Sequence, residues 1–305
     1  MKITVLGAGA VGGYFGGRML EAGLDVTFLV RENRAIQLRE TGLEIQSSQG
    51  NAHIRNLKLV VSACEIDACD IVIVAVKNYH LNQAIEQIRC LVDKGANVLP
   101  LLNGVEHIEI LQQAFGEKVV MGGLCQIIST LDRDGRILHN GSLHDMQIGA
   151  LHPDQESLGR KLFDALQDAN LRCLYKENIT LEMWLKYAFI TAFSAITTAA
   201  RLKIHDVLAT PATQAVFVQV LNEMQKLAKA NQVPIPDNFA ETTVHRMQLM
   251  PKGATSSMHQ DLSKGLPLEV ESLQGGALRL ASRLGVEIPT IQILYGLIKP
   301  YEGAK

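Results

Sequence analysis

Residues 7–12 have the types and spacing of a phosphate-binding turn. They read GAGAVG, which is the pattern Gly-x-Gly-x-x-Gly. In this pattern the first glycine permits a tight turn, the second lets backbone N–H groups approach a pyrophosphate, and the third lets a helix pack close to a strand. An apolar strand pattern at Lys2–Leu6 precedes the turn and a helical pattern at Ala10–Ala22 follows it, which argues against a glycine-rich turn without a ligand. The residues predicted to bind a dinucleotide are Gly7, Gly9, Ala10, Val11 and Gly12.

The residue that follows the second predicted strand should select between the two nicotinamide dinucleotides. NAD enzymes commonly hold the ribose hydroxyls with Asp or Glu at this position. This chain has Arg31 there, directly after the strand predicted at Asp25–Val30, and Glu32 comes next. An arginine can bind a 2′-phosphate with two parallel hydrogen bonds, so we predict NADP(H) as the cofactor. The alternative is that Arg31 is a solvated loop charge and that Glu32 binds the ribose.

Two polar residues follow apolar runs that predict buried strands. Lys77 comes after the run Ile71–Val76, and Asn103 comes after the run Asn97–Leu102. Continuous β-branched runs are typical of parallel strands that are buried on both faces, and ligands of such sheets lie at the carboxyl ends of the strands. Lys77 and Asn103 are therefore candidate ligand contacts. Each also has an ordinary explanation, Lys77 as a solvated charge and Asn103 as part of a turn.

Lys186 and Glu269 are the candidates for proton transfer. Lys186 directly precedes the strongly apolar stretch Tyr187–Ala200, so its charge must reach solvent, pair with an anion or face a cleft. Glu269 begins the helix predicted at Glu269–Gly285. A carboxylate beside a lysine can hold and tune that lysine as a general acid. The spacing of the two residues does not show whether they meet.

The elements that would position these residues divide into two parts. Up to residue 178, short β-branched runs alternate with helical patterns, as in a doubly wound parallel sheet. After it the β-branched runs stop and helical patterns follow one another, beginning with Thr180–Ala200. The sequence therefore predicts the α/β class, with a Rossmann-type dinucleotide-binding domain at 1–178 and an all-helical domain at 179–305. We expect the two domains to pack directly and to leave a cleft.

Within the first part, two further patterns concern strands. Loose alternation of apolar and polar residues predicts a hairpin formed by Leu43–Gln46 and His53–Val61. Arg136–His139 and Met146–Ile148 are predicted as separate strands, because the turn-prone segment Asn140–Ser142 lies between them.

Composition and charge exclude several classes of protein. The chain has 305 residues, 47% hydrophobic and 20% charged, which predicts about two globular domains and excludes a disordered chain. Its formal net charge of −2 argues against a dedicated nucleic-acid binder. The stretch 187–200 has 14 residues, too few to cross a bilayer of about 30 Å, and the N-terminus lacks a signal-peptide pattern. We therefore expect neither a nucleic-acid nor a membrane partner.

The cysteines and histidines indicate a reducing compartment and no metal site. The five cysteines are scattered and include no CxxC pair, so free, reduced thiols in a cytoplasmic protein are expected. The nine histidines show no metal-ligand spacing, and we predict no metal.

Taken together, the motifs give the chain a resemblance to the ketopantoate reductase (2-dehydropantoate 2-reductase) family. They occur in the family's order and similar spacing over nearly the whole chain. The matching pieces are GAGAVG at 7–12, Arg31, VKN with Lys77, LLNG with Asn103, WLK with Lys186, SSM at 256–258 and LEVE at 268–271. The resemblance implies a Rossmann domain joined to a helical domain with the active site between them. It also implies reduction of 2-dehydropantoate to (R)-pantoate with NADPH, a step towards pantothenate and coenzyme A.

The resemblance implies a role for each matched residue. Lys186 would be the general acid that protonates the developing alkoxide, and Glu269 would position Lys186 and contact the substrate or cofactor. Ser257 and Asn103 would bind substrate oxygens, with Asn103 also near the cofactor. Lys77 would lie near the cofactor ribose and the substrate. The expected partner is a small-molecule 2-keto acid, and the sequence leaves a homodimer open.

The chain departs from the family beside Lys186. Family members that make pantoate usually carry Asn four and eight residues after the catalytic lysine, followed by Pro. Here these positions are Ile190 and Ser194, followed by Ala195. Residues at this spacing share a helix face with Lys186, so Ile190 makes the pocket wall more apolar, while Ser194 stays a candidate substrate contact.

This departure leaves the substrate open. Other polar groups can replace the missing amides, in which case pantoate is still the product. One alternative is a reductase of a different 2-keto acid, because sites built on hydrogen bonds discriminate strongly. The other is a catalytically silent NADP-binding sensor. The presence of both Lys186 and Glu269 argues against the sensor, since cofactor binding alone needs neither.

Overall fold

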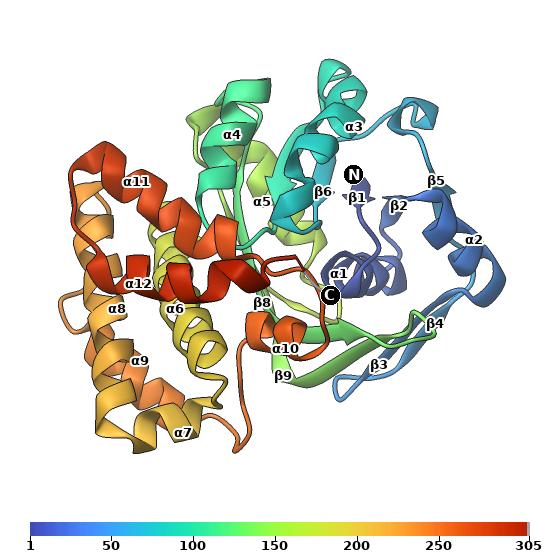
Figure 1. Cartoon of the computed structure of the whole chain (residues 1–305). Helices are drawn as coiled ribbons and strands as arrows, with labels where there is room; N and C mark the ends of the chain where they lie inside the picture. The colour runs from blue at the N-terminus through green and yellow to red at the C-terminus, as the bar shows by residue number, and fades with distance from the viewer. Residues whose placement is uncertain (304–305) are drawn as a thin grey trace. The chain divides into compact units, whose positions relative to one another are not determined.

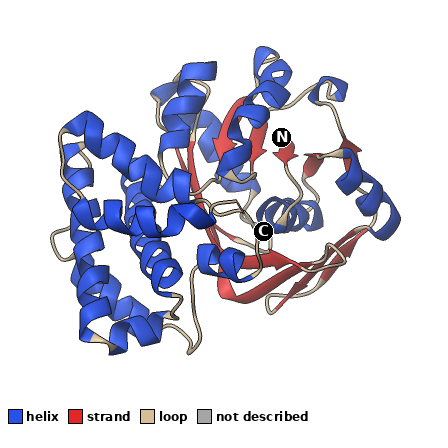
Figure 2. Cartoon of the chain, viewed as in Figure 1, coloured by secondary structure: helices blue, strands red, loops and turns tan. Residues whose placement is uncertain are grey.

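A computed structural model describes residues 1–303 of the chain, which form two compact units (Figure 1). The first unit comprises residues 1–102 and 107–179, and the second comprises residues 103–106 and the chain from Thr180 on. The strands belong to the first unit and the second is helical (Figure 2). The predicted α/β class, with a Rossmann-type domain followed by a helical domain, is confirmed. The structure differs in one detail, because the segment 103–106 belongs to the second unit.

A five-stranded parallel sheet forms the Rossmann-type part of the first unit. Its strand order is β5-β2-β1-β6-β7, and every pair is parallel. All four residues of β6 are buried, as its β-branched run predicts. The helices of this part are α1 (Ala10–Glu21), α2 (Glu32–Thr41) and α3 (Leu81–Asp93). The strands are β1 (Lys2–Leu6), β2 (Asp25–Leu29), β5 (Lys58–Val60), β6 (Ile71–Val74) and β7 (Asn97–Pro100).

A second sheet completes the first unit. It has the order β10-β9-β3-β4, and β8 pairs with β9 in antiparallel fashion. Two helices, α4 (Glu106–Phe115) and α5 (Glu156–Ala165), also belong to this stretch of the chain. The strands are β3 (Leu43–Ser47), β4 (Ala52–Ile54), β8 (Gly122–Leu131), β9 (Ile137–Gly149) and β10 (Arg172–Tyr175).

One strand prediction was confirmed only in part, and another was wrong. In the predicted hairpin, β3 and β4 do pair antiparallel, but β5 leaves this sheet and pairs parallel with β2. The two strands predicted around Asn140–Ser142 are one strand, β9. The turn-prone residues form a bulge, since Ser129 of β8 pairs with His139 while Ile127 pairs with His144. Pairing with the long strand β8 overrides the local turn signal.

Glycines of α1 let this helix lie between the two sheets. A Cβ atom at Gly16 would lie 2.6 Å from the ring of Phe28 in the parallel sheet. On the opposite side, a Cβ atom at Gly13 would lie 2.6 Å from Ile137, and one at Gly17 would lie 2.7 Å from Ile45. These glycines are therefore required for close packing rather than for ligand binding.

The second unit is built around α6 and α8. Buried residues of both helices, including Tyr187, Ala188, Val220 and Met224, belong to one hydrophobic core. The predicted helix Glu269–Gly285 contains a π-helical turn at Glu271–Gly275 before α11. The helices are α6 (Ile179–Ala200), α7 (Ile204–Ala209), α8 (Pro211–Ala230), α9 (Phe239–Gln248), α10 (Ser257–Ser263), α11 (Gly276–Leu284) and α12 (Pro289–Ile298).

Of the helices described in residues 1–303, α6 alone is long and apolar enough to cross a membrane by length and composition. The core helix of a water-soluble protein passes the same test when it is mostly buried. About 61% of the most apolar window of α6 is buried inside the structure. Its residues Trp184, Phe193 and Ile196 are part of the core, so α6 is consistent with a soluble protein.

Candidate active site

The glycine turn between β1 and α1 has the geometry of a phosphate cradle. Gly7 has a positive φ of 95°, and its N–H donates to the carbonyl oxygen of Leu29 at 3.0 Å. A Cβ atom at Gly12 would lie 2.0 Å from the carbonyl oxygen of Gly7, so only glycine closes the turn. A Cβ atom at Gly9 would meet nothing within 4 Å, which leaves the backbone there open to a ligand. Because α1 begins at Ala10, its N-terminal N–H groups can receive a pyrophosphate.

Arg31 lies at the carboxyl end of β2, where it precedes the first residue of α2. Its side chain is exposed, and its guanidinium donates to the side-chain oxygen of Gln83 on α3 at 3.3 Å. The competing residue, Glu32, lies 3.8 Å from Arg39 in an exposed ion pair. The position of Arg31 fits a 2′-phosphate of a dinucleotide bound at the glycine turn.

Arg34 forms a hydrogen bond with the backbone of the glycine turn, a role that the sequence did not reveal. Its Nε donates to the carbonyl oxygen of Ala8 at 3.0 Å, and its Nη1 donates to that of Gly135 at 3.0 Å. Burial lowers the pKa of the Arg34 guanidinium. Arg34 therefore holds the turn against the β8–β9 connection, whereas Arg31 stays exposed.

Lys77 follows β6, the strand next to β1, and precedes the 3₁₀ turn Asn78–His80. The segment that carries Lys77 contacts the glycine turn, since a Cβ atom at Gly7 would lie 3.1 Å from Cγ1 of Val76. Lys77 itself is half-buried. The first unit thus brings together the glycine turn, Arg31 and Lys77 at the carboxyl edge of one parallel sheet, as predicted for ligands of such sheets.

In the second unit, the structure joins two predicted site residues that are 166 positions apart. The Nδ2 of Asn103 donates to Oε2 of Glu269 at 3.3 Å, and Glu269 is only 6% exposed. The backbone beside Asn103 is close to the π-helical turn, because a Cβ atom at Gly104 would lie 3.0 Å from the carbonyl oxygen of Ser272. The pairing of Glu269 with Lys186 stays a prediction.

Arg279 on α11 connects the segment 103–106 to the π-helical turn through hydrogen bonds. It donates to both carboxylate oxygens of Glu106, at 2.8 and 2.7 Å, and to Glu271 at 2.8 Å. Glu271 also accepts hydrogen bonds from Lys299 and Tyr295. Burial raises the pKa of Glu271, but the hydrogen bonds from Lys299, Tyr295 and Arg279 outweigh burial and bring it to about 2.

The low pKa of Glu271 predicts a pH-dependent contribution to stability. Since the folded-state pKa lies below the usual 4.5, the contribution is fully present above about pH 4.5 and is lost as the pH falls towards 2. We expect Glu271→Gln to lower the midpoint of thermal unfolding at pH 7, with the difference from the wild type shrinking between pH 4.5 and 2. Glu287→Gln, an exposed change in the same unit, is the control. A difference that is constant over this pH range would contradict the prediction.

Lys186 is half-buried on α6, one turn before Ile190 and two turns before Ser194. Ser194 is 3% exposed, and its hydroxyl donates to the carbonyl oxygen of Ile190 at 2.6 Å. It also accepts a hydrogen bond from Nε2 of Gln274 at 3.1 Å. Substrate binding by Ser194 stays a prediction, and donation to a substrate would require this hydroxyl to leave the carbonyl oxygen of Ile190.

Ser257 is the exposed first residue of α10. The preceding Ser256 is buried, and its Oγ accepts from the backbone N–H of His259 at 3.1 Å. The same Oγ shares a hydrogen bond of 2.8 Å with Oγ1 of Thr197 on α6. Thr197 therefore fixes the start of α10, and with it Ser257, relative to α6.

Three residues of these networks were not predicted from the sequence, namely Gln274, Thr197 and Arg279. The first two are polar side chains inside apolar helical patterns, and buried polar groups need hydrogen-bond partners. That signal marks them as buried network residues, but it does not identify their partners. Within residues 1–303, no group of three or more His, Cys, Asp or Glu side chains is arranged to hold a metal ion.

Comparison with known families and proteins gives consistent matches. A family model described as ketopantoate reductase PanE/ApbA matches residues 3–153, and its C-terminal counterpart matches residues 178–302. An uncharacterized oxidoreductase, YkpB of Bacillus subtilis (strain 168), is 35% identical over 305 residues that cover 100% of both chains. A 2-dehydropantoate 2-reductase of Nostoc sp. (strain PCC 7120) is 26% identical over 99% of this chain and 95% of its own.

Solved structures share the fold over nearly the whole chain. A PanE/ApbA family ketopantoate reductase from Ralstonia eutropha JMP134 has a TM-score of 0.89 at 25% identity and covers 99% of this chain and 98% of its own. A D-mandelate dehydrogenase, solved with NADH and anilino(oxo)acetate, has a TM-score of 0.88 at 23% identity, with coverage of 99% and 98%. At this identity the second likeness shows the fold alone.

Proposed function

This chain belongs to the ketopantoate reductase family, and on that premise we propose that it reduces 2-dehydropantoate to (R)-pantoate with NADPH. Membership makes it an oxidoreductase, while the substrate and the preference for NADPH belong to the proposal. The hydrogen bond between Asn103 and Glu269 is the observation that carries it. Cofactor binding alone does not call for a buried carboxylate held in this way, whereas a site that orients a substrate does.

In the proposed mechanism, residues of the first unit bind the dinucleotide, and a residue of the second unit donates the proton. NADPH, when bound, supplies a hydride to the keto carbon of the substrate. Negative charge then develops on the former carbonyl oxygen, and the ammonium of Lys186 stabilises this charge and protonates the oxygen. Asn103, oriented by Glu269, and Ser257 bind oxygen atoms of the substrate.

The charge distribution supports an anionic cofactor and substrate. Arg31 provides an exposed guanidinium next to the glycine turn, where a 2′-phosphate would bind. Lys77 provides a cation at the neighbouring strand end, suited to the ribose of the cofactor and the carboxylate of a 2-keto acid.

Two alternatives follow from particular observations. Ile190 presents an apolar side chain one turn after Lys186, and Ser194 is bound to Gln274, which favours a 2-keto acid with fewer polar groups. The likeness to a D-mandelate dehydrogenase agrees, because it shows that the fold by itself does not select the acid. The remaining alternative, a silent NADP-binding sensor, requires Lys186 and Glu269 to be present without turnover.

A substrate panel separates these possibilities. Purified protein is mixed with NADPH and either 2-dehydropantoate or 2-keto acids with apolar side chains, and the loss of NADPH absorbance is followed. We expect the highest kcat/KM with 2-dehydropantoate. Turnover only with another acid would show that this acid, and not 2-dehydropantoate, is the substrate. A gain of 2-dehydropantoate activity in Ile190→Asn would then show that Ile190 excludes 2-dehydropantoate. NADPH binding without oxidation by any acid would favour the sensor.

We further propose that the protein works in the cytoplasm, without nucleic-acid or membrane partners, as a homodimer formed by the helical unit. Ile293 and Leu297 lie one turn apart on α12 and are 64% and 58% exposed, an apolar stripe that a second copy would cover. Sedimentation of the purified protein measures the mass, and a monomer at micromolar concentration would contradict the dimer.

A further inference from the structure

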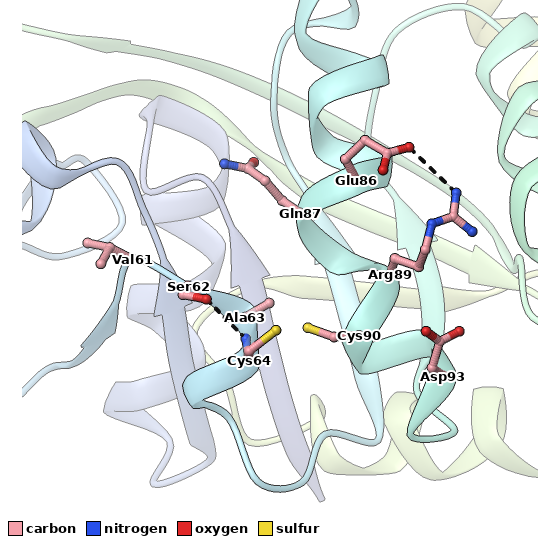
Figure 3. Close-up of a pocket in the computed structure, with 9 residues that line it drawn as sticks. All are labelled: Val61, Ser62, Ala63, Cys64, Glu86, Gln87, Arg89, Cys90 and Asp93. Atoms are coloured by element: carbon pink, nitrogen blue, oxygen red, sulfur yellow. Dashed lines mark hydrogen bonds and ion pairs between the residues drawn. The ribbon is translucent and has the colours of Figure 1, made fainter.

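Two cysteines of the first unit face each other at a pocket beside the parallel sheet (Figure 3). Cys64 lies in the 3₁₀ turn Ala63–Glu65 between β5 and β6, and Cys90 lies on α3. Figure 3 shows the two sulfur atoms pointing towards one another. Both residues line a pocket of about 380 Å³. Both cysteines are free thiols, and they come from segments that are separated by the whole of β6.

The two thiols differ in their access to solvent. Cys64 is exposed and Cys90 is half-buried. Burial raises the pKa of the Cys90 thiol, and a hydrogen bond with the side chain of Cys64 raises it further. Because Cys64 is exposed, a reagent in solution meets this thiol before that of Cys90, which lies next to it.

The other cysteines lack this arrangement. Cys125 and Cys173 are buried, and burial raises the pKa of Cys173 to about 12. Cys69 is half-buried, and its thiol donates to the carbonyl oxygen of Ile71 at 3.2 Å. The pair formed by Cys64 and Cys90 therefore combines an exposed thiol with a second thiol that faces it, which is the arrangement of a redox-sensitive site.

We propose that Cys64 and Cys90 form a reversible intramolecular disulfide when the protein meets a peroxide. The thiolate of Cys64 attacks one peroxide oxygen, the O–O bond breaks, and Cys64 becomes a sulfenic acid as hydroxide leaves. The sulfur of Cys90 then attacks the sulfur of Cys64, so that an S–S bond forms and the S–O bond breaks. The departing hydroxide takes the proton of Cys90 and leaves as water. Two thiols are oxidised and one peroxide is reduced, and a dithiol reductant reverses the change.

The disulfide would connect two segments beside the proposed cofactor site, the turn Ala63–Glu65 and the helix α3. It closes a loop over residues 64–90, which contains β6 and Lys77. It also anchors α3, where Gln83 lies two turns before Cys90 on the same face and accepts a hydrogen bond from Arg31. The formation of the bond itself depends only on the two thiols, so it stands independently of the proposed function.

Peptide mapping by mass spectrometry under non-reducing conditions tests the proposal. Full-length wild-type protein is treated with hydrogen peroxide at low protein concentration. We expect one cross-linked peptide pair that joins Cys64 to Cys90 and disappears on treatment with dithiothreitol. The midpoint of thermal unfolding should rise on oxidation by an amount on the order of 5 °C, because the cross-link restricts the unfolded chain. Cys64→Ser and Cys90→Ser should lose both effects, while the matched control Cys69→Ser keeps them.

Three results would overturn the proposal. They are a sulfinic acid on Cys64 with Cys90 still reduced, a disulfide between the Cys64 residues of two chains, and a cross-link from Cys64 to Cys69. Each is distinguished from the expected product by peptide mass and by electrophoresis without reductant. The experiment contains neither a dinucleotide nor a keto acid, so a negative result leaves the proposed function unaffected.

Discussion

Lys186→Ala is expected to lower kcat by about 10²- to 10⁴-fold while leaving the Kd for NADPH unchanged. In the proposed mechanism, Lys186 supplies the proton that the product oxygen needs, and alanine can neither stabilise the developing charge nor donate a proton. The glycine turn, Arg31 and Lys77, which are proposed to bind the dinucleotide, lie by contrast at the carboxyl edge of the sheet in the first unit. Steady-state kinetics measure kcat, and a titration followed by NADPH fluorescence measures the Kd for NADPH.

The control for this prediction is Lys226→Ala, which removes the same kind of side chain from an exposed position on α8. It should leave both kcat and the Kd for NADPH at the wild-type values. A Lys186→Ala protein that keeps full kcat would show that another group protonates the product. A Lys186→Ala protein that loses NADPH binding would show that this lysine belongs to the cofactor site.

Arg31→Ala is expected to raise the Kd for NADPH by about 10- to 100-fold and to change that for NADH by less than about 2-fold. The change removes charge-assisted hydrogen bonds worth roughly 1.5–3 kcal/mol to a phosphate that only NADPH carries. Because Arg31 is exposed and Arg34 separately holds the glycine turn, the turn itself should keep its shape. Titration of the two reduced dinucleotides by fluorescence gives both constants.

Arg39→Ala is the matched control, since Arg39 is an exposed arginine of α2, the helix that directly follows Arg31. It should leave the ratio of the two constants unchanged. Equal weakening of NADPH and NADH by Arg31→Ala would mean that the 2′-phosphate does not bind Arg31. Tighter NADH than NADPH binding by the wild-type protein would favour the alternative in which Glu32 holds the ribose hydroxyls.

The elements around the glycine turn were predictable because their signals are local. The strand predicted at Lys2–Leu6 is β1 without any shift, and the helix predicted at Ala10–Ala22 ends one residue earlier in the structure. In each case a β-branched run, a glycine or a helical spacing lies within the element itself or at its boundary.

The elements that were wrong depend on partners far away in the chain. β5 was predicted in a hairpin, but it pairs with β2, and the bulge inside β9 exists because β8 is long enough to pair on both sides of it. The π-helical turn at Glu271–Gly275 lies within a segment whose spacing predicts an ordinary helix. Local patterns do not carry information on such pairings, which tertiary packing selects.

The sequence by itself determined the family, the division into a Rossmann-type and a helical part, and the residue types available for chemistry. Those properties depend on composition, local periodicity and short motifs. Only the tertiary structure decided which side chains meet. The structure shows hydrogen bonds between Asn103 and Glu269, between Arg34 and Ala8, and between Ser194 and Gln274. It also shows that Cys64 faces Cys90. These contacts join residues that are 26 to 166 positions apart, and their distances depend on how whole elements pack.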